Sequence, residues 1–256
     1  PSFINKIKSV YWFRNKKGRT NISLIDIIKS STKKGMEIIY EKTTGKYFLH
    51  YPVERDWFPE EDIRNDKQVK YIQSGNRIIS LDPGIRKFLV GYDPTGTSTF
   101  FGEGAQEKLI QLLYRIDKTE DVTDSYILWK KVKNLIDEMH WKSISYLVEH
   151  YDTILLPDFR VSQMIKNSKK LKKITKRLMV MYSFHSFKEK LKYKCNTYNK
   201  KLIIVDESYT SCTCGQCGTI NRLGGNEVFL CKNCGIKMDR DVAASRNILI
   251  KNVSLR

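Results

Sequence analysis

Two pairs of cysteines near the C-terminus limit what this chain can fold into more than any other feature. Cys214 and Cys217 form one C-x-x-C pair, Cys231 and Cys234 form the other, and thirteen residues separate them. Two cysteines three positions apart on a tight turn can direct both sulfurs at one tetrahedral ion, and the glycine after each pair permits such a turn. Four thiolates leave no open position, so we expect one structural Zn²⁺.

The remaining cysteines, Cys195 and Cys212, have no such spacing, and we interpret them as ordinary thiols. No charged-then-apolar leader opens the chain, which favours metal binding over disulfides for the cysteine cluster. No stretch approaches the roughly 18 uncharged apolar residues of a membrane-spanning helix. The chain begins at Pro1 without Met, and we expect it to be a fragment of a longer protein.

The hydrophobic pattern of residues 78–249 predicts an α/β fold. Three successive strands separated by turn residues predict an antiparallel meander. The alternation of helices and strands that follows predicts parallel pairing, with ligand sites at the carboxyl ends of the strands. This is the element order of the ribonuclease H-like fold. The expected strands are 78–81, 87–92, 98–101, 153–156 and 202–205, and the expected helices are 124–147, 162–199 and 239–249.

The first part of the chain has a different pattern. Residues 1–75 are β-rich, with short aromatic and β-branched runs such as 38–40 and 47–51, and the polar residues 59–76 are typical of a linker. We therefore place a domain boundary between residues 75 and 76. The zinc-binding segment is expected at about 208–238, within the second domain.

The net charge of the chain is +18, which indicates a polyanionic partner. Residues 165–202 contain thirteen Lys or Arg against a single acid, Glu189, and so carry a net charge of +12. Such clustering favours nucleic acid as the partner. The candidate phosphate contacts are Lys166, Lys169, Lys170, Lys172, Lys173, Lys176 and Arg177.

Carboxylates follow several of the predicted strands. Asp82 ends the first strand, where it either caps a turn or meets a cation. Asp241 begins the last helix, where it either caps free N–H groups or binds a metal. Hydrolysis of phosphodiesters by two metal ions needs further carboxylates from other elements, and Asp158, Asp206 and Glu207 stand at the ends of the fourth and fifth strands. Because successive strand residues face opposite ways, Glu207 and Asp206 are not both expected at the site.

These motifs together resemble the C-terminal half of TnpB and, more closely, its eukaryotic and viral relatives, the Fanzor proteins. The resemblance covers about residues 76–250. It rests on Ser80-Leu-Asp82-Pro-Gly84, Tyr209-Thr-Ser211, the two cysteine pairs, and Asp239-Arg-Asp241-Val-Ala-Ala-Ser-Arg-Asn247. The resemblance implies a RuvC-like nuclease domain with an inserted zinc ribbon. Residues 1–75 resemble, less strongly, the end of the β-barrel wedge domain that grips the guide RNA.

The resemblance also implies an Asp–Glu–Asp site holding two Mg²⁺. Asp82 matches the first position and Asp241 the last. TnpB has its Glu at the end of the fourth strand, where Pro157 stands here, whereas many Fanzor proteins carry a compensating Glu on the strand before the ribbon. Glu207 fits that position, and Asp158 is the alternative.

The function that the resemblance implies is an RNA-guided, Mg²⁺-dependent DNA endonuclease. Its partners would be a guide RNA derived from the transposon end and a target DNA, with no membrane and no small-molecule substrate. The location would be nuclear for a eukaryotic or viral protein and otherwise cytoplasmic. Two alternatives stay open: a nuclease-inactive protein that binds guide RNA or DNA, and an unguided, structure-specific nuclease of the RuvC type.

Overall fold

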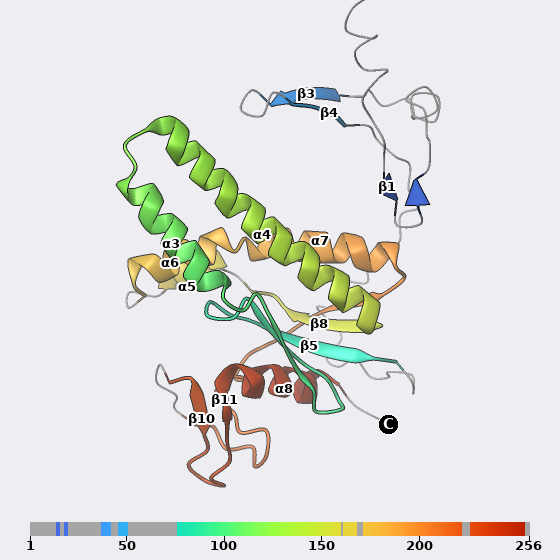
Figure 1. The fold of residues 1–256 in the computed structure, drawn as a ribbon. Coiled ribbons are helices and arrows are strands. Elements are labelled where there is room, and N and C mark those ends of the chain that lie inside the picture. Colours follow the sequence, from blue (N-terminus) through green and yellow to red (C-terminus); the bar gives the residue numbers. More distant parts are fainter. Residues whose placement is uncertain are drawn as a thin grey trace, which may run out of the picture. The chain divides into compact units, whose positions relative to one another are not determined.

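The computed structural model describes residues 14–15, 18–19, 37–41, 46–50, 76–159, 161–167, 171–221 and 226–253 (Figure 1). The chain separates into two compact units, residues 1–59 and 60–256. In the first unit, β1 (Arg14–Asn15) pairs with β2 (Gly18–Arg19), and β3 (Glu37–Glu41) pairs with β4 (Lys46–His50), both antiparallel. The β3–β4 hairpin confirms the strands predicted there. The polar segment predicted as a linker falls on residues 59–76, of which 59–75 lie outside the described part.

A mixed sheet forms the centre of the second unit. Its order is β7-β6-β5-β8-β9, in which β5, β6 and β7 pair antiparallel and β5, β8 and β9 pair parallel. The predicted meander and the predicted parallel pairing are thereby confirmed. The strands are β5 (Ile78–Pro83), β6 (Leu89–Tyr92), β7 (Ser98–Phe101), β8 (Thr153–Pro157) and β9 (Lys201–Val205).

Helices cover both faces of this sheet (Figure 1). Alternate residues of β5 point to opposite faces of the sheet. Ile79 and Leu81 pack with the helices α3 to α7, whereas Ile78 packs with Ile248 of the last helix. A strand buried on both faces is mostly apolar, as β8 is, and in β5 the exceptions Ser80 and Asp82 belong to the alternating set that includes Ile78. The helices are α3 (Ala105–Lys118), α4 (Val122–His150), α5 (Val161–Asn167), α6 (Lys173–Met181), α7 (Phe184–Thr197) and α8 (Arg240–Asn252).

Two helical assignments from the sequence need correction. No element was assigned to residues 105–118, although Leu109, Leu113 and Ile116 repeat at helical spacing and are buried in α3. The helix predicted over 162–199 is instead three helices. Ser183 adopts a left-handed φ of 48°, which separates α6 from α7.

The break before α7 turns Tyr182 into the core. Its ring is fully buried, its hydroxyl donates to the Ile85 carbonyl over 2.9 Å, and its own carbonyl lies 2.9 Å from Nε2 of His140. Burial lowers the pKa of His140 to about 4, so this imidazole is neutral near pH 7 and its Nε2–H donates to Tyr182. The break at Ser183 and these two hydrogen bonds therefore occur at adjacent residues.

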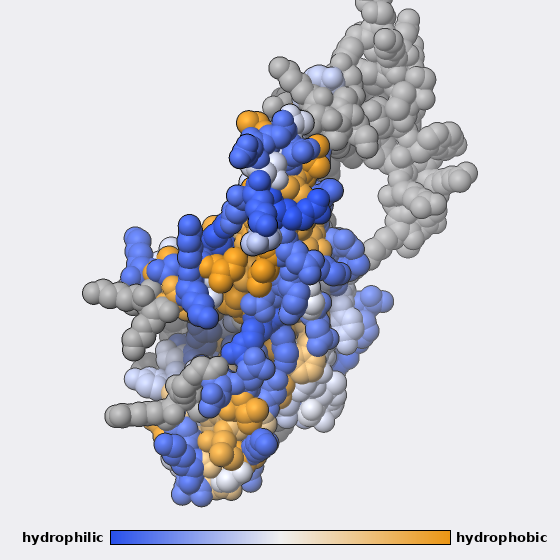
Figure 2. All heavy atoms as spheres, turned by 60° about the vertical axis from the view of Figure 1, so that its left-hand side comes forward, coloured by the Kyte–Doolittle hydropathy of each residue, from blue (hydrophilic) through white to orange (hydrophobic). Residues whose placement is uncertain are grey.

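The surface shows hydrophobic patches between hydrophilic side chains (Figure 2). Exposed apolar residues are prominent on α3 and α4, namely Tyr114, Val122, Tyr126, Ile127 and Trp129. Among the described helices, none combines the length and the apolar character that crossing a bilayer requires.

Candidate nuclease site and cysteine cluster

Asp82 lies inside β5, next to its end, and not in the turn that follows. Ser80 pairs with Leu155 of β8, so two residues further on Asp82 is level with Pro157, which in turn pairs with Val205 of β9. Ser80 faces α8 and donates to the Ser245 carbonyl over 2.7 Å. By alternation Asp82 faces the same helix.

Asp241 is the second residue of α8, and the cap of this helix is a different acid. Asp239 is the N-cap: its Oδ1 accepts hydrogen bonds from the backbone N–H groups of Asp241 (2.9 Å) and Val242 (3.2 Å). Its Oδ2 pairs with Nζ of Lys87 at 2.8 Å. The capping role considered for Asp241 therefore belongs to Asp239, which leaves the Asp241 carboxylate available for another task.

Asp206 and Glu207 follow β9 and have different surroundings. The exposed Asp206 carboxylate accepts from the Ser208 hydroxyl (2.6 Å) and pairs with Lys251 (2.7 Å), which lowers its pKa to about 2. Glu207 is half-buried, and this burial is the main cause that raises its pKa. The charges of Asp206 and Asp158 raise it further. On β9, Ile203 and Val205 face α8, and Glu207 follows two residues after the strand ends.

The charges of Asp241 and Glu207 both act on the carboxyl group of Asp82. Burial raises the pKa of Asp82 well above its ordinary value, the charges of Asp241 and Glu207 raise it further, and Arg240 opposes them. Although Asp82 keeps part of its surface exposed, its carboxyl group is closely surrounded by protein. Burial also raises the pKa of Asp241, and the charge of Asp239 is the second-largest cause of this rise. Like charges gathered in this way are costly unless cations or protons neutralise them.

Asp158 occupies a different position from these three. It directly follows β8 and pairs with Nζ of Lys188 on α7 at 3.2 Å. Its charge raises the pKa of Glu207 but is not among the causes of the shifts at Asp82 and Asp241. Asp158 is thus already paired with a cation, and Glu207 rather than Asp158 acts on the carboxyl of Asp82.

The four cysteines predicted to bind zinc lie together. Their sulfur atoms are all within 4.8 Å of one another, with Cys214–Cys234 and Cys217–Cys231 separations of 3.6 Å. Tetrahedral Zn–S bonds place sulfurs about 3.8 Å apart, so this donor set fits a structural zinc. Hydrogen bonds with Thr219 lower the pKa of Cys217, whereas neighbouring thiols of the cluster raise that of Cys234, so the fit to zinc rests on the positions of the sulfurs.

The other two cysteines lie elsewhere. Cys195 is buried in the main hydrophobic core, where burial raises its pKa to about 12, and Cys212 donates to the Tyr209 carbonyl at 3.3 Å. Neither belongs to a metal-binding group among the described residues.

Asn247 connects the cysteine cluster to the carboxylate site, and the sequence analysis did not identify this role. From α8 its amide donates to the carbonyls of Thr210 (2.8 Å) and Thr213 (2.7 Å), the second of which directly precedes Cys214. A Cβ on Gly215 would collide with the Asn247 side chain. The close packing holds the segment after Glu207 against the helix that carries Asp241. The signal available in the sequence was the polar Asn inside an otherwise apolar helix face.

The basic segment is partly neutralised by acids. Lys188, Lys190 and Lys200 pair with Asp158, Asp137 and Asp152. Arg177 forms a two-pronged pair with Asp117, with N···O distances of 2.6 and 2.9 Å. Lys166, Lys172 and Lys173 are exposed and Lys176 is half-buried, whereas Lys169 and Lys170 lie outside the described residues.

Comparison with known sequences places the chain among transposon- and CRISPR-related proteins. The family model described as "Cas12f1-like, TNB domain" matches residues 184–248, which run from α7 to α8. A candidate transposase of Paramecium bursaria Chlorella virus 1 is 34% identical over 200 residues, 71% of this chain and 45% of the viral protein. A TnpB-like protein of Acanthamoeba polyphaga mimivirus is 27% identical over 234 residues, 84% of this chain and 43% of that protein.

A third relative, the CRISPR-associated endodeoxyribonuclease Cas12f1 of Sulfoacidibacillus thermotolerans, is 34% identical over 86 residues, 32% of this chain and 20% of that protein. The chain spans less than half the length of these relatives.

Two solved structures share the α/β fold. Cas12f1, in the cryo-EM structure of the Cas12f1–sgRNA–target DNA complex, matches with a TM-score of 0.51 and 16% identity over 83% of this chain and 55% of that one. The mini-RNA-guided endonuclease CRISPR-Cas_phi3 matches with a TM-score of 0.52 and 13% identity over 91% of this chain and 53% of that one. The family-model match, the TnpB-like relatives and the shared fold identify the chain as a TnpB/Fanzor-type protein.

Proposed function

We propose that this chain carries the nuclease domain of a transposon-associated, RNA-guided DNA endonuclease, with Asp82, Glu207 and Asp241 as its catalytic carboxylates. The observation that supports this most is that the charges of Glu207 and Asp241 act on the buried carboxyl of Asp82, although the three side chains come from β5, from the segment after β9 and from α8. Among the described residues their carboxylate oxygens are not all within 4.8 Å of one another. Acidic groups from distant parts of the chain nevertheless act on one buried carboxyl, which their charges destabilise. Such an arrangement is typical of a cation site.

The names of the relatives support the proposed partners. One relative is a CRISPR-associated endodeoxyribonuclease, and one structural neighbour was solved with an sgRNA and a target DNA. We infer the same two partners, a guide RNA and a target DNA, for this protein. We also infer that residues 76–256 form a RuvC-like domain with a zinc ribbon at about 208–238, and that residues 1–75 are a wedge-like segment that binds guide RNA. A nuclear location, for a eukaryotic or viral protein, stays a prediction.

The carboxylate set fits Mg²⁺, which prefers oxygen ligands and is bound in enzymes through carboxylates together with substrate phosphates. Asp82, Glu207 and Asp241 would hold the ions, which would activate a water molecule and stabilise the leaving oxygen. The protein itself contributes the positions of these groups. Asp239 caps α8 and so orients Asp241, while the Thr210 amide and hydroxyl donate to the Glu207 carbonyl at 3.1 and 2.7 Å and fix the turn there.

Glu207 is favoured over Asp158 as the third ligand for a physical reason. Asp158 is already paired with Lys188, and its release would leave that lysine without this partner. The charge of Glu207 raises the pKa of Asp82, whereas that of Asp158 is not among the causes of this shift. Strand β8 lies between β5 and β9, and its Pro157 offers no side-chain oxygen. A ligand that follows β9 must therefore be longer, which favours Glu207.

The test is cleavage by three nearly isosteric variants that remove only charge. Glu207→Gln is expected to abolish Mg²⁺-dependent cleavage of guide-matched DNA, by at least about a thousandfold, while binding persists. Asp206→Asn, its chain neighbour, should cut within a few-fold of the unmodified protein. If Asp158→Asn eliminates cleavage and Glu207→Gln does not, strand β8 supplies the ligand and the assignment is wrong.

The same preparation separates the rival functions. Pro157 at the level of Asp82 is the observation that favours a nuclease-inactive binding protein. That alternative predicts copurifying RNA without cleavage under any divalent metal. An unguided nuclease predicts cleavage of branched DNA without any copurifying RNA.

A further inference from the structure

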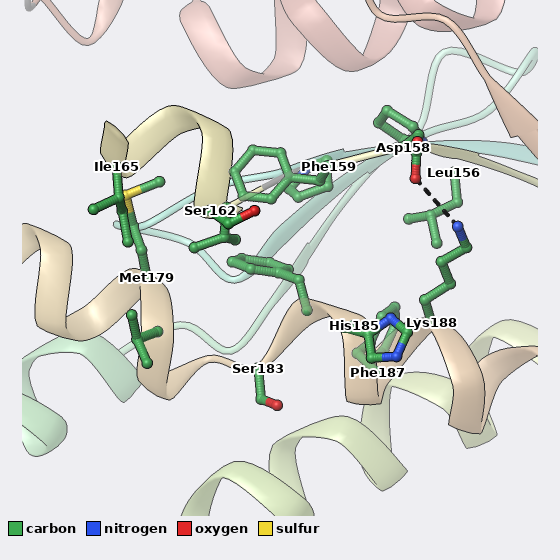
Figure 3. A pocket seen from close by; sticks show the side chains of 15 residues that line it. Leu156, Asp158, Phe159, Ser162, Ile165, Met179, Ser183, His185, Phe187 and Lys188 are labelled. Carbon is green, nitrogen blue, oxygen red and sulfur yellow. Dashed lines mark hydrogen bonds and ion pairs between the residues drawn. The ribbon is translucent and has the colours of Figure 1, made fainter. Parts of the chain in front are cut away.

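A pocket of about 500 Å³ opens on the α6–α7 side of the sheet, at the end of β8. Its walls come from Pro83 of β5, the segment Leu156–Phe159, α5, α6 and the start of α7. Figure 3 shows Asp158 and Lys188 at one end, Ile165 and Met179 at the other, and Phe159 between them. The volume lies within the ~300–1,000 Å³ that small-ligand sites occupy.

The lining combines flat apolar surfaces with a few polar groups. Phe159 and Phe184 lie edge to face, with ring centroids 4.7 Å apart, and both rings contribute to the wall. Ser162 and His185 are exposed and Lys188 is half-buried, so donors line the mouth of the pocket. Apolar walls with polar groups at the rim suit a heteroaromatic ring whose edge carries hydrogen-bonding atoms.

The pocket shares its wall with the carboxylate site. Pro83 directly follows Asp82, and their Cα atoms are therefore about 3.8 Å apart. By strand alternation Asp82 faces α8, whereas Pro83 faces the pocket. The pocket and the carboxylates therefore lie on opposite sides of the same strand ends. A strand of nucleic acid that crosses this edge would place a phosphate at one and a neighbouring base at the other.

A second hollow of about 540 Å³ lies next to the pocket. Ile165 and Val180 line both hollows, so the two are neighbours on the surface. The second is lined by Trp129 of α4 and by basic residues of α6, among them Lys173 and Lys176. A basic groove that contains aromatic rings is how proteins bind single-stranded nucleic acid.

We propose that the first pocket binds an unpaired base of the DNA strand being cut, next to the scissile phosphate, and that the second hollow guides the same single strand onward. This rests on the proposed function for the location of the scissile phosphate. The Phe159 and Phe184 rings supply apolar contact with the base, Ser162, His185 and Lys188 supply hydrogen bonds at its edge, and Lys173 and Lys176 contact the backbone phosphates.

The experiment fills the pocket without disturbing the carboxylates. Ser162→Trp adds bulk at the pocket mouth, and Met164→Trp is the matched control, because Met164 lies on the same short helix, is 41% exposed and lines neither hollow. Binding of single-stranded DNA oligonucleotides is measured by fluorescence anisotropy in Ca²⁺, with one abasic position moved along the strand. The unmodified protein and Met164→Trp are expected to lose about tenfold in affinity at one abasic position. Ser162→Trp is expected to lose that affinity on intact DNA and to show no further loss at any abasic position.

The outcomes separate this proposal from the proposed function. If the protein cuts DNA but every abasic position lowers its affinity equally, the base pocket is overturned and the proposed nuclease function stands. A single sensitive position that Ser162→Trp removes, in a protein that never cuts, would support the pocket and count against the nuclease. Equal losses in Ser162→Trp and Met164→Trp would overturn the pocket, because bulk anywhere on α5 would then have the same effect.

Discussion

At the scale of single residues, the burial of Asp82 near two other acids determines how the stability of the metal-free protein should change with pH. The pKa of this carboxyl is higher in the folded chain than its ordinary value of 3.8. A group that binds its proton more tightly when folded stabilises the fold below its ordinary pKa. That contribution is lost as the pH rises through the higher, folded value. The ionised site is therefore a destabilising feature near neutral pH.

Asp82→Asn is accordingly expected to raise the melting temperature of the metal-free protein at pH 7, by roughly 2–4 °C for each kcal/mol of repulsion relieved. The difference should shrink as the pH falls toward the ordinary pKa of aspartate, and Mg²⁺ should stabilise the unmodified protein more than the variant. Differential scanning calorimetry across pH checks both.

Asp206→Asn is the control of opposite sign. Lys251 and Ser208 lower the pKa of Asp206 to about 2, so its contribution is present above its ordinary pKa and is lost as the pH falls toward 2. Its removal should lower stability at pH 7 by less than about 1 kcal/mol, because the pair is exposed. A stabilising Asp206→Asn together with a destabilising Asp82→Asn would contradict the assigned environments.

At the scale of elements, the cysteine cluster and α8 depend on each other. The cluster has little apolar surface of its own: Cys214, Phe229 and Cys231 pack on Ala243 of α8. The antiparallel pair β10 (Val228–Leu230) and β11 (Lys237–Asp239) leads directly into that helix. We therefore expect so small a unit to fold with a bound metal, in which case the binding free energy of the metal is also folding free energy.

Metal analysis of the purified protein is expected to give one zinc per chain. Cys231→Ser should lose it and should expose the cluster to proteolysis, whereas Cys212→Ser should keep it, since that sulfur only contacts the Tyr209 carbonyl. Stoichiometric zinc in Cys231→Ser, or none in the unmodified protein, would rule out the four-cysteine site.

Asn247→Ala tests the connection between the cluster and α8. The substitution leaves the carbonyls of Thr210 and Thr213 without their amide donor in a buried place, which should cost about 2 kcal/mol. Asn252→Ala, on the same helix, removes hydrogen bonds of 2.9 and 3.4 Å at a less buried position and should cost under about 1 kcal/mol. Urea unfolding measures the loss in free energy of unfolding for both variants. Equal losses would show that the Asn247 hydrogen bonds contribute no more than those of Asn252.

At the scale of the whole molecule, the charge of +18 governs how the protein meets nucleic acid. Affinity for DNA falls with salt in proportion to the number of phosphates that cations contact, by about 0.7–0.9 in log–log slope for each phosphate. Only those basic residues that contact phosphates contribute to this slope. The ion pairs of Arg177, Lys188, Lys190 and Lys200 make them weaker candidates than composition suggests.

Replacing Lys173 and Lys176 by Ala should therefore lower the salt slope for single-stranded DNA by about 1.4, which is two phosphate contacts. Lys142→Ala, on α4 and paired with Glu138, should leave the slope unchanged. Titrations between low and moderate salt provide the comparison. An unchanged slope in the double variant would show that this face of α6 is merely solvated.

Local patterns in the sequence determined much of this protein. The strands and their parallel pairing follow from mostly apolar runs such as Ile78–Leu81 and from their alternation with helices, because a strand buried on both faces is largely apolar. The four cysteines follow from spacing alone, since tetrahedral coordination needs two turns with cysteines three apart. The resemblance to the TnpB and Fanzor proteins is confirmed, and it was carried by these same local motifs.

Only the tertiary structure decided which neighbour each side chain meets. Asp239 rather than Asp241 caps α8, and Lys188 pairs with Asp158 from a helix 30 residues away in the sequence. The break at Ser183 depends on hydrogen bonds that Tyr182 forms with the distant Ile85 and His140. Local spacing determines the period of an element and the identity of a ligand set. Long-range contacts decide the break in a helix, the partner of a charge and the pKa of a buried carboxyl, because their free energies depend on residues that only the folded chain brings together.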